Sequence, residues 1–230
     1  MRNEFHRVLG ASMLATVIVS ASACGLRSFE RPQSQTVSST HLSTHDLIAY
    51  RMLDVGDFHA AAPPGVIAAH AQDFWAYSCL QLRPRNDAPL AIVATSTNPS
   101  RFRATPIGLH YSAYFDRDCS WWNPAGRAPP GYTLQHEQIH FLITELAARR
   151  LNARAAEIIR AATVEAATPE AAREAAQQVL RSVMQSAVRQ VDAVHLAFDR
   201  DASKGAHIDQ QQAWWMRLSA QLDNDDSNSK

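Results

Sequence analysis

The expected fold of this chain depends on Tyr132–Leu151, which reads YTLQHEQIHFLITELAARRL. The tripeptide at 129–131, Pro-Pro-Gly, breaks the chain just before it, and Thr133 is placed to cap a first helical turn. Apolar residues then recur at helical spacing on the side that carries His136 and His140. The pattern therefore predicts a helix from 133 to about 162 whose histidine-bearing face is buried.

The pentapeptide His136-Glu137-Gln138-Ile139-His140 is the candidate chemical motif. A spacing of four residues places the two imidazoles on one face of a helix, one turn apart, where both can bind a single Zn²⁺ ion. Glu137 would then lie near the open coordination position, where a carboxylate can take a proton from water. This HExxH pattern predicts a zinc-dependent hydrolase with Glu137 as its catalytic residue. The alternative is an amphipathic helix whose histidines only form hydrogen bonds in the core.

A catalytic zinc ion usually has three protein ligands, so a third metal ligand is expected. A helical hairpin that turns near residue 165 would place His136 level with about residue 194 on the returning helix. Asp199 is the expected third ligand, and His195 and His207 remain alternatives. Two further carboxylates are candidate hydrogen-bond acceptors for the ligating rings, Asp192 and Asp201.

The N-terminus has the features of an export signal. Two arginines precede an apolar run of about thirteen residues, and small residues lead to Cys24. We expect a signal peptide at 1–23, lipidation of Cys24 and a flexible tether at 24–45. The chain would then be a membrane-anchored lipoprotein that faces the periplasm or the cell exterior. The alternative is ordinary cleavage at the same bond, which leaves Cys24 unlipidated.

Two cysteines remain once Cys24 is assigned. An even number of cysteines in an oxidising compartment favours a disulfide between Cys79 and Cys119, and two buried free thiols are the alternative. The formal net charge is zero, with 22 basic and 22 acidic residues, and no basic stripe indicates a nucleic-acid partner.

The rest of the chain predicts an α+β domain over 46–222. Short apolar segments interrupted by turn signals predict a small antiparallel sheet, with strands within 47–53, 74–82, 90–95 and 107–115. Thr168-Pro169 begins a second long helix that returns along the first, and Gln210–Leu222 forms a short C-terminal helix. We expect residues 223–230 to be a disordered tail.

Two blocks of the sequence resemble the DUF922 family, exported bacterial proteins classed as predicted zinc proteases. The first is the helix from Leu134 to Leu151, since that family has a similar HEQxHF run there. The second is the set Phe198-Asp199, Gly205 and Gln211-x-x-Trp214, which has matching spacings. The resemblance covers about 47–222 and implies a zincin-like fold with peptidase activity.

Three positions depart from the family pattern. Leu142 replaces an Asp, and Ala202 and Lys204 stand where a Thr and a His are expected. If that family histidine binds metal, Asp199 or His207 must substitute for it in this chain, and the lysine would otherwise indicate a degenerate site.

The sequence thus predicts a zinc metallopeptidase of the bacterial envelope that hydrolyses an amide bond in a peptide or protein substrate. The alternative is a non-catalytic envelope lipoprotein, with a binding or structural role and a degenerate or structural metal site. The paired tryptophans at 121–122 and 214–215 are interpreted as core aromatics, with a partner-binding surface as the alternative.

Overall fold

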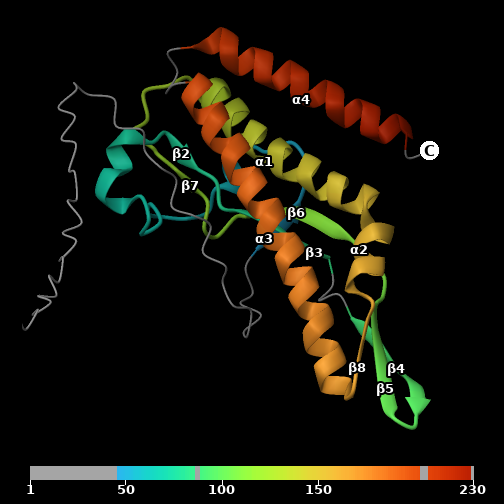
Figure 1. The fold of residues 1–230 in the computed structure, drawn as a ribbon. Helices are drawn as coiled ribbons and strands as arrows, with labels where there is room; N and C mark the ends of the chain where they lie inside the picture. The colour runs from blue at the N-terminus through green and yellow to red at the C-terminus, as the bar shows by residue number, and fades with distance from the viewer. Residues whose placement is uncertain (1–45, 86–88, 203–206, 229–230) are drawn as a thin grey trace, which may run out of the picture.

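The computed structural model describes residues 46–85, 89–202 and 207–228, which form a mixed α+β structure (Figure 1). All of its strand pairs are antiparallel and they belong to three small sheets. The first sheet has the order β1 (Leu47–Ala49), β6 (Tyr111–Asp116), β3 (Leu80–Pro84). The second pairs β2 (Ala76–Tyr77) with β7 (Trp121–Trp122), and the third has the order β4 (Leu90–Thr97), β5 (Ser100–Pro106), β8 (Val164–Ala166).

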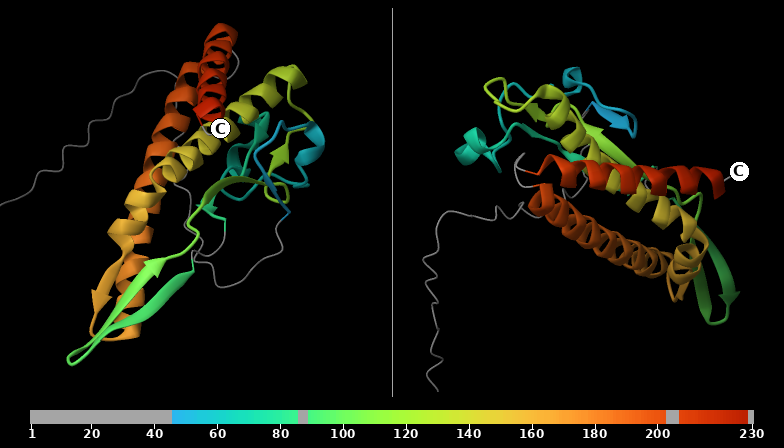
Figure 2. Two further views of the ribbon diagram at one scale, coloured as in Figure 1. Left: turned by 90° about the vertical axis from the view of Figure 1, so that its right-hand side faces the viewer. Right: turned by 90° about the horizontal axis from the view of Figure 1, so that it is seen from above.

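Four α-helices account for most of the second half of the chain. They are α1 (Pro130–Ala153), α2 (Ala155–Ala162), α3 (Pro169–Ala202) and α4 (Ile208–Asn228). Two short 3₁₀ helices precede them, η1 (Val55–Asp57) and η2 (Ala68–Asp73). Helix α4 lies alongside α1 and α3 at the end of the molecule away from the β4–β5 hairpin (Figures 1 and 2).

Helix α1 is buried on two sides, which explains why so many of its residues are inaccessible. One side packs on the first sheet, where Phe141 contacts Phe115 with ring centroids 5.8 Å apart. The other side meets α3 and α4 in a core that contains Ile139, Leu142 and Phe198. The histidine motif therefore lies on a helix that is fixed by the sheet on one side and by two helices on the other.

The third sheet extends away from this core (Figure 2). It has its own small cluster of buried alanines, Ala104, Ala172 and Ala176, where β5 contacts the first turns of α3. These small side chains allow the strand and the helix to approach closely.

Several predicted elements differ from the observed ones. One sheet was expected and three are present, and β5 falls on a Ser- and Arg-containing segment that has little apolar signal. The first helix is interrupted at Arg154, whose φ of −103° and ψ of 10° are non-helical, so α1 and α2 are separate. Strand β8 occupies the expected helix-to-helix turn because it completes the third sheet by pairing with β5.

The start of α3 agrees with the sequence prediction, and the end of α4 does not. Thr168 caps α3 as expected, since its Oγ1 accepts a hydrogen bond of 3.1 Å from the Ala171 amide. The prediction of a disordered tail from 223 is wrong as far as 228, because α4 continues to Asn228. Arg149 on α1 holds this last turn through an ion pair with Asp226.

Cys79 and Cys119 form a disulfide, with Cα atoms 5.7 Å apart. The predicted signal peptide at 1–23, the lipidated Cys24 and the tether at 24–45 lie outside the described residues. Within the described ranges, no helix is both long and apolar enough to span a bilayer.

Candidate metal centre

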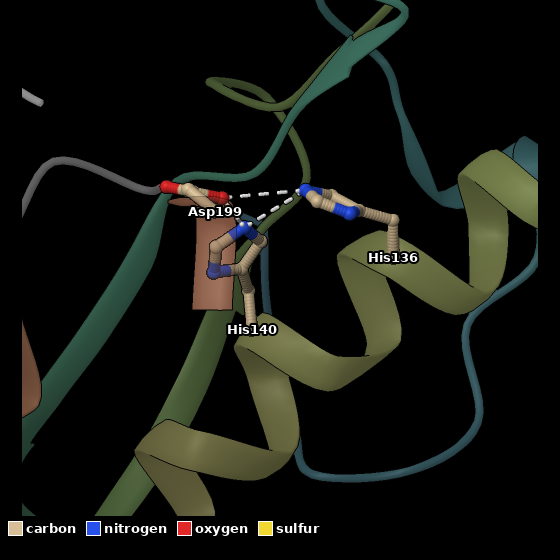
Figure 3. A group of neighbouring side chains, drawn as sticks. All are labelled: His136, His140 and Asp199. Atoms are coloured by element: carbon tan, nitrogen blue, oxygen red, sulfur yellow. Dashed lines mark hydrogen bonds and ion pairs between the residues drawn. The ribbon is translucent and has the colours of Figure 1, made fainter. Parts of the chain in front are cut away.

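Three side chains from two helices converge at one point (Figure 3). His136 and His140 project from adjacent turns of α1, and Asp199 reaches them from the last turns of α3. The Asp199 Oδ1 atom is 2.9 Å from His140 Nε2 and 3.4 Å from His136 Nε2. The two Nε2 atoms are 3.2 Å apart.

These distances match what a tetrahedral zinc site requires. Ligand atoms about 2.0–2.1 Å from a tetrahedral zinc ion lie roughly 3.3 Å from one another. Each of the three separations is within about half an ångström of that value, and each residue offers a different donor atom to the same point. The group could therefore hold one divalent ion with three protein ligands.

The second ring nitrogen of His140 has a buried partner. His140 Nδ1 is 2.8 Å from Nδ1 of His195 on α3, and His195 Nε2 is 3.4 Å from the Thr144 hydroxyl. Thr144 in turn donates to the His140 carbonyl at 3.1 Å. If His140 Nε2 is a metal ligand, its Nδ1 carries the proton and donates to His195, which places the His195 proton on Nε2, toward Thr144. The chain of hydrogen bonds is then complete.

The second ring nitrogen of His136 is held from α4. Its Nδ1 is 3.2 Å from the Oε1 atom of Gln211, which is fully buried. The Gln211 amide donates to the Tyr132 carbonyl and to Gln135 Oε1, each at 3.0 Å. This fixes the amide so that its oxygen faces the histidine, and His136 Nδ1 is the donor.

The histidines and Asp199 shift one another's pKa toward the charged forms. Burial would lower the pKa of His136, but the Asp199 hydrogen bond and the charges of Glu137 and Asp199 raise it above its usual value. Burial would raise the pKa of Asp199, but the charge of His140 and hydrogen bonds from both rings lower it strongly. Asp199 is thus a carboxylate, the form that ligates a metal.

Glu137 follows His136 on α1 and is nearly inaccessible, at 5% exposure. Its Oε2 atom accepts a hydrogen bond from the Ser78 hydroxyl, between β2 and β3. Its charge raises the pKa of His136, so the carboxylate is within electrostatic reach of that ring.

The alternative third ligands lie elsewhere. His195 is behind His140 rather than beside Asp199, and His207 is an exposed residue at the start of α4. Of the two expected acceptors, Asp201 accepts the indole N–H of Trp214 at 3.1 Å. The roles expected for Asp192 and Asp201 are instead filled by His195 and Gln211. Lys204, at the family histidine position, lies outside the described residues.

Sequence reasoning missed the roles of Gln211 and Ser78. Gln211 was noted only for its Gln-x-x-Trp spacing, and nothing in the sequence places a loop serine 59 positions before Glu137 against it. A second group, Asp46, His59 and Asp118, was also missed, but all three side chains are exposed and Arg117 forms an ion pair with Asp46.

Comparison of the chain with family models, with curated proteins and with solved structures finds no match. The similarity to the DUF922 family is therefore a prediction that depends on the residues quoted above.

Proposed function

We propose that this protein is a zinc-dependent metallopeptidase of the bacterial envelope, with His136, His140 and Asp199 as metal ligands on an HExxH helix. The observation that supports the proposal most strongly is the convergence of three donor atoms at separations of 2.9, 3.2 and 3.4 Å. The buried acceptors behind both imidazoles support it as well, because ligating histidines usually donate their second N–H in this way.

The proposed reaction is hydrolysis of an amide bond. When bound, zinc lowers the pKa of a coordinated water and polarises the substrate carbonyl. Glu137 accepts a proton from the attacking water and passes it to the leaving nitrogen, as general base and then general acid. Because Glu137 is buried, bulk water does not compete for its carboxylate. His195 and Gln211 hold the two imidazoles in the tautomer that presents Nε2.

The proposed location and partners come from the sequence. An export signal at 1–23 and a lipidated Cys24 would hold the domain at a membrane, and the tether at 24–45 would allow it to reach peptide or protein substrates in the envelope. The disulfide between Cys79 and Cys119 supports an oxidising compartment.

The test compares the full chain with Glu137→Gln. We expect one zinc ion per chain in both proteins, and hydrolysis of dye-labelled casein or a mixture of internally quenched peptides by the wild type alone. The rate should fall by about 10²–10⁴-fold in the variant, the usual contribution of a general base. The matched control is Glu145→Gln, because Glu145 pairs with Arg149 on another side of α1.

Two outcomes would contradict the proposal. Undiminished cleavage by Glu137→Gln would remove the assigned base. A wild-type chain that binds no zinc, or binds it without cleaving any of these substrates, would favour the non-catalytic lipoprotein.

A further inference from the structure

Ser78 is a buried serine that no part of the HExxH pattern predicts. It lies between β2 and β3, its side chain is 1% exposed, and its hydroxyl oxygen is 2.5 Å from Glu137 Oε2. Ser78 belongs to the strand-forming half of the chain, and Glu137 lies on helix α1 in the helical half. The two residues are 59 positions apart, so the contact is a product of the tertiary fold.

The contact restricts how the Glu137 carboxylate can rotate. The terminal torsion of a glutamate is broad and roughly two-fold, so an unheld carboxylate samples many orientations. A hydroxyl that donates to an ionised carboxylate forms a short, charge-assisted hydrogen bond. With Oε2 held by Ser78, Oε1 is the oxygen left to accept a proton.

We propose that Ser78 is a positioning residue for the general base Glu137, holding one carboxylate oxygen so that the other faces the water to be activated. This inference rests on the proposed function. Ser78 acts on the proposed reaction through its hydrogen bond to the Glu137 carboxylate.

The backbone next to Ser78 is anchored from three directions, which makes a fixed orientation possible. The Cys79 amide donates to the Ser120 hydroxyl at 3.0 Å, and the Cys79 carbonyl accepts from the Asp116 amide at 2.9 Å. The Cys79 side chain is bound to Cys119 by the disulfide. Ser120 is itself buried and donates to the Asp116 carbonyl at 2.7 Å. The turn between β6 and β7 therefore fixes the backbone next to Ser78.

The first experiment measures kcat, KM and zinc affinity for the full chain, Ser78→Ala and Ser78→Thr. We expect kcat of Ser78→Ala to fall by up to about 100-fold, because a small misplacement of a catalytic group can cost that much, with KM and the zinc Kd within about two-fold of wild type. Ser78→Thr keeps the hydroxyl and should restore most of kcat. The matched control is Ser112→Ala, a half-buried strand serine on β6, which should match the wild type.

Equal kcat for Ser78→Ala and the wild type would overturn the proposal. So would a loss of zinc affinity in parallel with kcat, because Ser78 would then support the fold of the site and not the base.

A second experiment needs no turnover. A double-mutant cycle on the urea midpoint combines Ser78→Ala with Glu137→Ala, and the double variant should be less destabilised than the sum of the two single variants. Additive effects would show that the contact is absent and would overturn the proposal. A wild type that hydrolyses nothing overturns the proposed function instead, and the cycle distinguishes that failure from a failure of the Ser78 contact.

Discussion

At the scale of single residues, the two imidazoles of the motif differ in how they are supported. His140 relies on another histidine, His195, and His136 relies on the amide of Gln211. To accept the N–H of His140, the His195 ring must be neutral and must carry its own proton on Nε2, the nitrogen that faces away from His140. The 3.4 Å approach of His195 Nε2 to Thr144 supplies the partner for that proton.

We expect His195→Leu to weaken zinc binding by about 10–100-fold, because the variant leaves the His140 N–H buried without an acceptor. His195→Gln retains an acceptor and should bind more tightly than the leucine variant. The zinc Kd is measured by competition with a chromophoric chelator, and His207→Ala is the control because His207 is exposed. Equal Kd values for wild type and His195→Leu would show that His195 does not support the site.

Asp57 is a second residue whose charge is set by its neighbours. Its side chain is buried and forms an ion pair with Arg51 at 2.5 Å. Burial would raise the pKa of Asp57, but hydrogen bonds from Arg51 and the Asp54 backbone lower it below its usual 3.8. A lowered folded-state pKa contributes stability above the unfolded pKa, and this contribution is lost as the pH falls through the folded value.

Asp57→Asn should therefore lower the free energy of unfolding at pH 7 by about 1.5–3 kcal/mol, the range for hydrogen bonds to charged groups. The difference between variant and wild type should shrink as the pH is lowered below about 3.8, in urea unfolding followed by circular dichroism. Asp118→Asn, at an exposed carboxylate, is the control. A difference that stays constant with pH would contradict the ion-pair explanation.

At the scale of elements, the sequence predicts the helix that carries the HExxH motif. It predicts only approximately which part of α3 lies opposite that motif. The i, i+4 spacing of His136 and His140 is fixed by helix geometry, so their convergence follows from the sequence. The level of Asp199 depends on how α1 and α3 cross. Counting from an expected turn near 165 placed His136 opposite residue 194, but it lies opposite Asp199. The break at Arg154 and the strand β8 in the connection account for the shift.

The turn between β6 and β7 is the element that should respond to redox conditions. Reduction of Cys79–Cys119, or replacement of both cysteines by alanine, removes a link between residues 40 positions apart. The free energy of unfolding should fall by about 4 kcal/mol in the chain-entropy model. The zinc Kd should change little, because no ligand lies on this loop, whereas kcat should fall as Ser78 is released.

The test measures the unfolding free energy, the zinc Kd and kcat before and after treatment with a phosphine reductant. Serine substitution at Cys24, the third cysteine of the chain, serves as the control because it leaves the disulfide intact. Loss of zinc on reduction would mean that the disulfide supports the ligands and not the base.

At the scale of the whole molecule, the α+β class could be predicted and the division of the sheet could not. Hydrophobic patterns indicate where strands occur, but the sequence contains no local signal for which strands pair. Strand β5 pairs with β4 through a short turn and also with β8, 60 residues later, next to α3, which packs on both β5 and β8. Gln211 and Ser78 could not be predicted for the same reason, since each reaches the site from a separate element.

The site joins three helices, so metal binding should stabilise the whole domain. Ligands come from α1 and α3, and Gln211 extends the network to α4, whose Trp214 packs on Phe198 with ring centroids 5.6 Å apart. Zinc that binds the folded chain alone adds about 4.1 kcal/mol when its free concentration is 1,000 times the Kd. For a domain of this size that corresponds to a rise in Tm of about 8–16 °C.

This rise is measured by calorimetry with zinc and after chelation with EDTA, which should reverse it. Asp199→Ala should show a much smaller rise, because two imidazoles bind zinc more weakly than three ligands do. His59→Ala should behave as wild type, which separates this site from the exposed Asp46, His59 and Asp118 group. If His59→Ala removes the rise and Asp199→Ala does not, the zinc that stabilises the fold is bound at that exposed group. The rings on α1 would then share a proton with Asp199 in place of a metal ion.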